Sequence, residues 1–335
     1  MDINLIGLIR AAVLNGTPLL FGTSGEILTE KSGNLNLGVE GLMFMGGAFG
    51  LCGAFVYGQA AGDHAVGAVA VAIALLASFA AGVIGSLIFS FLTITLRANQ
   101  NVTGLALTIF GTGVGQFVGE LMRLKVGGNV TVSNALKDAF ANPVLPKFLQ
   151  DIPVVGPILF SYNFFVYLGF AAAIIMAYVM AKTRCGLSLC AVGESPATAD
   201  AAGINVTLYK YLSTCIGAGI CGIGGLYYVL DYNQGIWATT GQIEALGWLA
   251  VALGIFTTWK PLNAIWGAYL FGMLYWLYQF LPSLLGITMA SHITDLVQML
   301  PYVVTIIVLI VVSMRKKKEN QPPAHLGLAY FREER

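Results

Sequence analysis

Charge is scarce in this sequence of 335 residues. It has 17 lysines and arginines and 16 aspartates and glutamates, or 10% of the chain, whereas roughly 25% is usual for a soluble domain. Hydrophobic residues make up 57%, and the mean hydropathy is +0.78. So few charges cannot cover the surface of a soluble globule of 35.5 kDa. This composition excludes a soluble enzyme, a disordered chain and a nucleic-acid-binding protein, and it indicates a polytopic protein embedded in a lipid bilayer.

Residues and motifs for metal or nucleotide chemistry are also few. The three histidines are scattered, and the five cysteines form no C-x-x-C pair, so we expect packing cysteines, no metal site and no cofactor. No G-x-x-x-x-G-K-[ST] motif occurs, which excludes a P-loop for ATP. A literal G-x-G-x-x-G at Gly217–Gly222 lies inside an apolar stretch without a preceding strand. It is therefore interpreted as a helix-packing surface, as in small-residue contacts between membrane helices.

Long apolar stretches are abundant. A membrane-spanning helix needs about 20 apolar residues. Stretches of this kind lie at 5–28, 37–58, 65–92, 101–121, 162–181, 209–231, 241–258, 261–281 and 292–314. The sequence therefore predicts an all-α membrane protein with about nine spans, within a range of about eight to ten. The stretch 241–258 is short enough to be broken or re-entrant. We expect a transmembrane domain over residues 1–315 and a basic tail over residues 316–335.

The distribution of positive charge predicts an orientation. Arg315, Lys316, Lys317 and Lys318 directly follow the last apolar stretch, which places the C-terminus in the cytoplasm. With nine spans, the N-terminus is then outside. The loop 122–161 faces the outside, and its four prolines argue against a long helix. The tail beyond Lys318 is expected to be flexible and solvated.

A polar segment joins the first two apolar stretches at residues 25–41. Irregular polar backbone cannot face lipid, so this segment either lies in the cytoplasmic interface or is buried against protein and lines a cavity. Asn34 and Asn36 offer donors and acceptors that suit a neutral polar ligand. Glu40 lies inside the apolar run, where a carboxylate needs a partner or water. An ordinary cytosolic turn is the alternative.

A second polar segment lies at residues 182–208. Ser195 suits an N-cap, Pro196 the first helical position and Gly203 the C′ position of a helix of about two turns. This short helix either docks into a groove of a soluble partner or merely joins two spans. The residues alone leave both interpretations open.

Further polar and small residues lie in the apolar stretches. Glu244 is a second candidate intramembrane carboxylate, although an interfacial position remains an alternative. Trp259 and Lys260 match an interfacial anchor before a sharp turn. Asn101 and Gln116 either face a pore or connect helices, and the second role is favoured. Six glycines are expected to let helices approach closely, namely Gly217, Gly222, Gly247, Gly254, Gly267 and Gly272.

Three motifs resemble one family of proteins. The first, at residues 30–41, reads EKSGNLNLGVEG and is similar to E-[RK]-[SA]-G-x-x-N-[LI]-G-[LIV]-E-G. The second, at residues 191–206, reads AVGESPATADAAGINV and is similar to G-E-[NS]-P-x-A-A-x-x-x-G-I-x-V. The third, at residues 247–261, reads GWLAVALGIFTTWKP and is similar to G-W-[IL]-A-x-A-L-x-[IL]-F-x-x-W-x-P. These are motifs of permease subunits of ATP-binding-cassette (ABC) importers that serve branched-chain amino acids, ribose and nucleosides. The first motif is most similar to the nucleoside branch.

The resemblance implies a division of labour among subunits. The helix at residues 195–203 would be a coupling helix that docks onto a cytosolic ATPase, through Gly193, Glu194, Ser195, Pro196, Ala199, Asp200 and Gly203. The residues Asn34–Glu40 would lie near the translocation path. The permease would pair with a second, identical or related permease, and an extracytoplasmic solute-binding lipoprotein would deliver the solute. The expected location is a bacterial plasma (inner) membrane.

The resemblance leaves the solute open. A purine nucleoside is the first choice, and a simple sugar, a riboflavin-like compound or a branched-chain amino acid are alternatives. A stand-alone ion-coupled transporter is a further alternative, for which Glu40 and Glu244 would be the candidate intramembrane charges. An intramembrane enzyme lacks a nucleophile and base set in this sequence.

Overall fold

The computed structural model describes residues 2–128, 130–132, 134–237, 242–285, 291–315 and 321–332. Its described part is built of helices, with one isolated bridge between Thr131 and Ile236. The α-helices are α1 (Asp2–Glu30), α2 (Val39–Ala61), α3 (Gly67–Ser90), α4 (Gln100–Val126), α5 (Asn134–Ala141), α6 (Lys147–Gln150), α7 (Phe164–Lys182), α8 (Arg184–Glu194), α9 (Pro196–Ala201), α10 (Val206–Tyr227), α11 (Gln242–Phe256), α12 (Pro261–Leu285), α13 (Ser291–Gln298) and α14 (Leu300–Arg315). A 3-10 turn, η1 (Gly62–His64), and three π-helical turns, η2 (Phe91–Thr95), η3 (Gly156–Phe160) and η4 (Tyr228–Tyr232), complete the described elements.

Six segments are long and apolar enough to cross a membrane. They are Leu5–Glu30, Val39–His64, Gly67–Thr95, Gln100–Val126, Phe164–Lys182 and Val206–Tyr232. They match the first six predicted stretches. The remaining three correspond to α11, α12 and the α13–α14 pair, and of these α11 has 15 residues and α14 has 16. The chain is thus an all-helical, multi-pass membrane protein, as predicted, while the count of nine spans stays a prediction.

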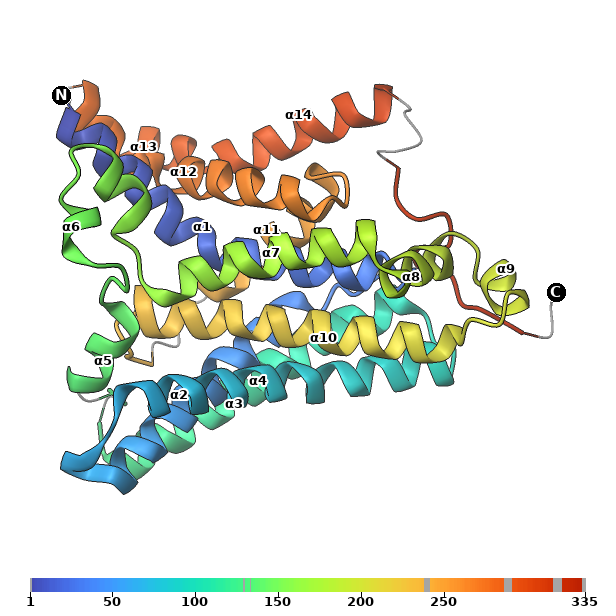
Figure 1. The fold of residues 1–335 in the computed structure, drawn as a ribbon, viewed down its shortest axis with the longest axis horizontal. Helices are drawn as coiled ribbons and strands as arrows, with labels where there is room; N and C mark the ends of the chain where they lie inside the picture. Colours follow the sequence, from blue (N-terminus) through green and yellow to red (C-terminus); the bar gives the residue numbers. More distant parts are fainter. Residues whose placement is uncertain are drawn as a thin grey trace.

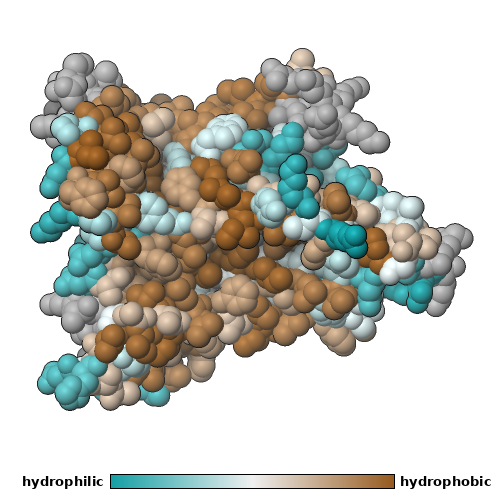
Figure 2. Space-filling model, viewed as in Figure 1, coloured by the Kyte–Doolittle hydropathy of each residue, from teal (hydrophilic) through white to brown (hydrophobic). Residues whose placement is uncertain are grey.

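The long helices run along one axis of the molecule (Figure 1). α1 packs against α10, α11 and α12, and α10 also packs against α2 and α3. The N-terminus, α5 and α6 lie at one end, and α8, α9 and the C-terminus lie at the other. Figure 2 shows apolar side chains over most of the visible face and hydrophilic residues at both ends. Exposed side chains such as Leu76 and Ile109 therefore face the region that lipid occupies.

Helices cross closely at most of the predicted packing glycines. A Cβ added at Gly217 would lie 2.4 Å from the carbonyl oxygen of Gly25, and one at Gly272 would lie 2.5 Å from that of Ala12. The same holds at three further glycines. A Cβ added at Gly222 would lie 2.7 Å from Ser78 O, one at Gly247 would lie 2.4 Å from Glu40 Cα, and one at Gly267 would lie 2.8 Å from Thr257 Cγ2. At Gly254 the nearest atom, Glu30 Oε2, would lie at an ordinary 3.6 Å. Close backbone approach at small residues is a usual source of stability between membrane helices.

The loop between α4 and α7 contains only short helical elements, α5, α6 and η3. This agrees with the prediction made from its prolines. It is attached to the bundle because Asn163 Nδ2 donates a hydrogen bond of 2.7 Å to Asp231 Oδ1, and Val132 N donates one of 3.3 Å to Gly235 O. The loop therefore packs on the same end of the molecule as the N-terminus.

Candidate functional site

The break between α1 and α2 is buried inside the protein. α1 continues to Glu30, and the irregular segment covers residues 31–38. The side chains of Ser32, Asn34 and Asn36 are at most 1% exposed. Asn36 Oδ1 accepts a hydrogen bond of 2.9 Å from Gly38 N, the N-cap position of α2, so the side chain supports the start of that helix. Of the predicted alternatives, burial against protein describes this segment.

Two neighbouring helices hold this irregular segment in place. From α4, Gln100 Oε1 accepts a hydrogen bond of 2.7 Å from Leu35 N, and Thr108 Oγ1 donates one of 3.0 Å to Leu37 O. From α10, Thr214 Oγ1 accepts one of 2.9 Å from Asn34 Nδ2. These contacts satisfy polar backbone that lipid could not satisfy. Because both helices contact the break, a shift of either helix must move it.

Three carboxylates lie next to the break. Glu26 and Glu30 are 1% exposed, and Glu40 is 7% exposed. Glu30 accepts a hydrogen bond from Trp259 Nε1, and Glu26 lies close to Glu30 and to the backbone of Asn36. Ionisable side chains inside a membrane protein are costly to bury and usually have a function. The buried polar cluster, defined as Glu26, Glu30, Asn34, Asn36 and Glu40, is therefore the candidate site.

The predicted path residues divide into three groups. Asn34, Asn36 and Glu40 are all buried in or directly after the break, and they are the predicted members of the buried polar cluster. Asn101 and Gln116 are exposed on α4, outside this cluster. The side chain of Glu244 lies outside the described residues.

The sequence analysis did not single out two members of this site, Glu26 and Glu30, or the neighbouring Trp259. Glu26 and Glu30 are spaced i, i+4 in the last turns of α1, and this spacing was the available signal for a shared helix face. Trp259 was interpreted as an interfacial anchor, and this was wrong. It is 4% exposed because the turn at Thr258 and Trp259, with φ angles of 54° and 53°, directs the indole inward to Glu30.

The second polar segment forms two helices where one was predicted. The predicted short helix is α9, in which Ser195 Oγ accepts a hydrogen bond from Thr198 N and Pro196 begins the helix. Gly203 follows it with a φ of 84°, the left-handed conformation that favours glycine. The preceding helix α8 was missed, although Thr183 is its N-cap and accepts a hydrogen bond of 3.1 Å from Gly186 N.

The end of α8 touches the break between α1 and α2. A Cβ added at Gly193 would lie 2.2 Å from the carbonyl oxygen of Lys31 and 3.2 Å from Gly33 N. Two backbones approach this closely only where no side chain intervenes. Since α9 follows α8 after one residue, α8 connects α9 to residues 31–38 over a short distance.

The C-terminal segment 321–332 reinforces this contact. His325 N donates a hydrogen bond of 3.0 Å to Gly193 O, and Gly327 N donates one of 3.1 Å to Gly33 O. Gln100 Nε2 donates to Leu328 O at 3.3 Å. The expectation of a flexible, solvated tail is therefore wrong for residues 321–332, because backbone groups of the segment pair with the break and with α8. Residues 316–320 lie outside the described part.

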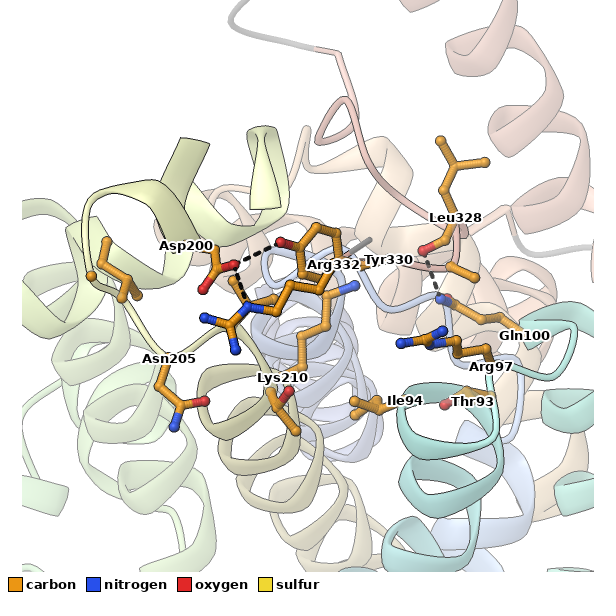
Figure 3. A pocket seen from close by; sticks show the side chains of 15 residues that line it. Thr93, Ile94, Arg97, Gln100, Asp200, Asn205, Lys210, Leu328, Tyr330 and Arg332 are labelled. Carbon is orange, nitrogen blue, oxygen red and sulfur yellow. Dashed lines mark hydrogen bonds and ion pairs between the residues drawn. The ribbon is translucent and has the colours of Figure 1, made fainter. Parts of the chain in front are cut away.

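The segment also attaches to α9. Tyr330 Oη donates a hydrogen bond of 3.0 Å to Asp200 Oδ2, and Arg332 Nε donates one of 3.1 Å to the same oxygen (Figure 3). Burial and the nearby charge of Lys210 lower the pKa of His325 from its usual value of 6.5. The docked segment therefore holds a neutral imidazole. Together, α8, α9 and the C-terminal segment form one assembly around the break.

Comparison with known proteins adds the family. A model of the branched-chain amino acid transport system permease component matches residues 8–309. A putative glucose ABC transporter permease protein of Haloferax volcanii, TsgC13, is 34% identical over 80% of this chain and 75% of its own length. A guanosine ABC transporter permease protein of Bacillus subtilis, NupQ, is 33% identical over 79% of each chain. A nucleoside ABC transporter permease protein of Lactococcus lactis, NupC, is 30% identical over 91% of this chain and 93% of its own.

The family match spans almost the whole described helical bundle, from α1 to α14. The buried polar cluster, α8, α9 and α11 all lie within the matched residues. With the fold, the site and this match together, the chain belongs to the family of permease components of branched-chain amino acid transport systems.

Proposed function

We propose that this chain is the permease subunit of an ABC importer for nucleosides, with a purine nucleoside as the first choice. The family match supports the permease role, the names of NupQ and NupC support this substrate class, and the name of TsgC13 supports a sugar as the alternative. The chain is a transport subunit and not an enzyme. A separate cytosolic ATPase supplies the energy.

We propose nine spans, with the three beyond the long apolar helices supplied by α11, α12 and the α13–α14 pair. α11 is the short, re-entrant candidate. The end of the molecule that holds α8, α9 and the C-terminus faces the cytoplasm of a bacterial cell, which agrees with the positive charges after α14. The N-terminus lies outside.

The partners follow from this arrangement. The ATPase docks at α9 through the accessible members of the predicted coupling residues, Glu194, Ser195, Asp200 and Gly203, whereas Gly193, Pro196 and Ala199 are buried within the chain. A second permease, identical or related, completes the membrane part. An extracytoplasmic solute-binding lipoprotein delivers the solute at the opposite end, where the loop between α4 and α7 lies.

The contact of Gly193 with Lys31 carries the coupling mechanism. It links α8, the helix that directly precedes the proposed docking helix α9, to residues 31–38 through backbone atoms in close contact. When the ATPase changes state, α9 and α8 move together and displace the break, which alters the surroundings of Asn34, Asn36 and Glu40. The ATPase thereby shifts the balance between outward-open and inward-open forms, provided that it binds the two forms with different affinity.

The chemistry of the buried polar cluster suits a nucleoside. Amide side chains both donate and accept hydrogen bonds, as the edges of a purine base require, and carboxylates accept from ribose hydroxyls. A second role remains open for the carboxylates, because Glu26, Glu30 and Glu40 are an acidic group of the kind that binds ions in secondary transporters.

Reconstitution tests this function. The complete complex in proteoliposomes, with its binding protein, should accumulate radiolabelled guanosine only when ATP is supplied to the ATPase. Unlabelled nucleosides should compete and glucose should not. ATP-independent accumulation driven by a proton or sodium gradient would overturn the proposal in favour of an ion-coupled transporter. Competition by glucose alone would assign the alternative substrate.

A substitution tests the coupling route separately. We expect Gly193→Ala to reduce ATP-dependent uptake at least about tenfold while the ATPase still co-purifies, because the added Cβ displaces α8 from Lys31. The matched control is Cys185→Ala on the exposed side of the same helix, which should transport normally. Normal uptake by the Gly193 variant would contradict coupling through this contact and would leave the permease assignment unaffected.

A further inference from the structure

A polar pocket of about 430 Å³ lies at the α9 end of the molecule, outside the buried polar cluster. It opens between the end of η2, the start of α4, the start of α10 and the C-terminal segment (Figure 3). The lining residues with charge or hydrogen-bonding capacity include Arg97, Gln100, Asp200, Lys210, Tyr330 and Arg332. Two of these, Tyr330 and Arg332, are present only when the C-terminal segment is docked.

Lys210 is the unusual residue in this pocket. It lies near the start of α10 and is 3% exposed, and among the described residues no hydrogen bond or ion pair engages its ammonium group. In Figure 3 the side chain points into the pocket, toward the space between Arg332 and Gln100. An ammonium group is costly to bury without a counter-charge. The positive end of the α10 dipole, only a few residues away, adds to this cost.

The described residues that line the pocket do not supply the missing negative charge. Asp200 is the one carboxylate among the lining residues, and its Oδ2 already accepts hydrogen bonds from Tyr330 and Arg332. Arg97 brings a further cation, with its guanidinium 4.6 Å from the centre of the Phe331 ring. The N-terminal ends of α4 and α10 both open toward the pocket. Helix N-termini and guanidinium groups are typical ligands of phosphate.

We infer that this pocket binds a phosphate-bearing anion, with the ammonium of Lys210 as the buried ligand and Arg97 and Arg332 at its mouth. The inference rests on the pocket alone and does not require the proposed transport function. Because the C-terminal segment forms part of the wall, bound phosphate and the docked segment stabilise each other. The site thereby makes the assembly of α8, α9 and the C-terminal segment sensitive to phosphate compounds on its side of the membrane.

Direct binding tests the site without measuring transport. The full-length chain in phosphatidylcholine nanodiscs is titrated calorimetrically with inorganic phosphate and, separately, with guanosine monophosphate. We expect saturable binding of at least one of them. Lys210→Met should weaken it at least about tenfold and Arg332→Gln severalfold, since each removes a charge-assisted contact. Lys182→Met is the matched control, because Lys182 is an exposed lysine at the same end of the molecule outside the pocket.

A third arm distinguishes a lipid headgroup from a soluble ligand. If phosphate binds only weakly in phosphatidylcholine discs and discs containing phosphatidylglycerol protect the C-terminal segment from proteolysis in a Lys210-dependent way, the phosphate belongs to a lipid. Arg332→Gln is a second test of the site in case Lys210→Met misfolds, because Arg332 is largely exposed and its substitution should not affect folding. The inference is overturned if no arm detects binding, or if Lys210→Met and Lys182→Met bind alike.

Discussion

At the scale of single residues, the described part of the C-terminal segment carries one imidazole, that of His325. His325 contacts α8 through its backbone, and its ring lies 6.5 Å from that of Tyr330. Among the described residues, Lys210 of α10 is the charged group that acts on the ring, and Glu194 of α8 accepts a hydrogen bond from the adjacent Ala324 N. Burial and Lys210 together lower the pKa of His325, so docking favours the neutral ring.

This pKa shift predicts a pH dependence of docking. With a pKa that is lower when docked than when released, His325 contributes fully to docking above about pH 6.5, its ordinary pKa. The contribution is lost as the pH falls from about 6.5 through the lowered value, because the released segment then binds more protons. A nitroxide on Ala324→Cys, in a chain carrying Cys185→Ser, should be immobile at about pH 7.5 and more mobile at about pH 5.5.

The control for this experiment is His325→Gln, which cannot titrate. Its label should show the same mobility at both pH values. Equal mobility of the unsubstituted segment at both values would contradict the role assigned to the imidazole.

Residue chemistry alone predicted part of the candidate site. Asn34, Asn36 and Glu40 stood out because polar side chains in an apolar run demand an explanation. Glu30 and Trp259 lie 229 positions apart, and their hydrogen bond depends on a left-handed turn at Thr258 that no local pattern announces. Lys210 was equally inconspicuous, because its burial depends on a C-terminal segment that composition predicts to be solvated.

At the scale of helices, the crossing of α2 and α10 is set by backbone contact. A Cβ added at Gly225 would lie 1.8 Å from the carbonyl oxygen of Met43. A clash with backbone cannot be relieved by a rotamer change, so the helices would have to separate. Helix crossings in membranes depend on this close approach.

We therefore expect Gly225→Ala to destabilise the protein by about 1–3 kcal/mol, the usual cost of overpacking. Thermal unfolding of the purified protein in detergent measures the effect. The control is Gly113→Ala on α4, where an added Cβ meets nothing within 4 Å. That variant should be neutral or slightly more stable, because alanine is favoured over glycine in a helix by about 1 kcal/mol. Equal melting temperatures for both variants would contradict this account of the crossing.

Local sequence signals predicted some helices well and missed others. Apolar length located the six long spans well, because the need to satisfy backbone polar groups in lipid leaves few alternatives to a helix. The predicted stretch 292–314 is divided into α13 and α14, with Pro301 at the second position of α14, where proline is tolerated. α8 was missed because its short, mixed sequence lacks the apolar periodicity on which the prediction relied.

At the scale of the whole molecule, the two ends are built from different elements. One end holds α5, α6 and the N-terminus, and the other holds α8, α9 and the C-terminus (Figure 1). Native thiols allow this polarity to be tested, because Cys185 is exposed on α8. We expect the neighbouring Cys190 to react more slowly, because burial raises the pKa of its thiol.

We expect a membrane-impermeant maleimide to leave Cys185 unlabelled in intact spheroplasts and to label it after permeabilisation. A cysteine at exposed position 138 on α5, made as Asp138→Cys, should label in both preparations. Mass spectrometry of the tryptic peptides measures both sites. Labelling of Cys185 in intact spheroplasts would reverse the proposed orientation.

The hydrogen bond between Gly327 and Gly33 joins residues that lie nearly three hundred positions apart in the sequence. Residues up to Gly327 must therefore be synthesised and leave the ribosomal exit tunnel before the break near the start of the chain acquires all its contacts. The surface around α9 is completed late in synthesis. A product truncated before residue 321 would keep the preceding helices but lack the contacts that residues 321–332 make with α8, α9 and the break.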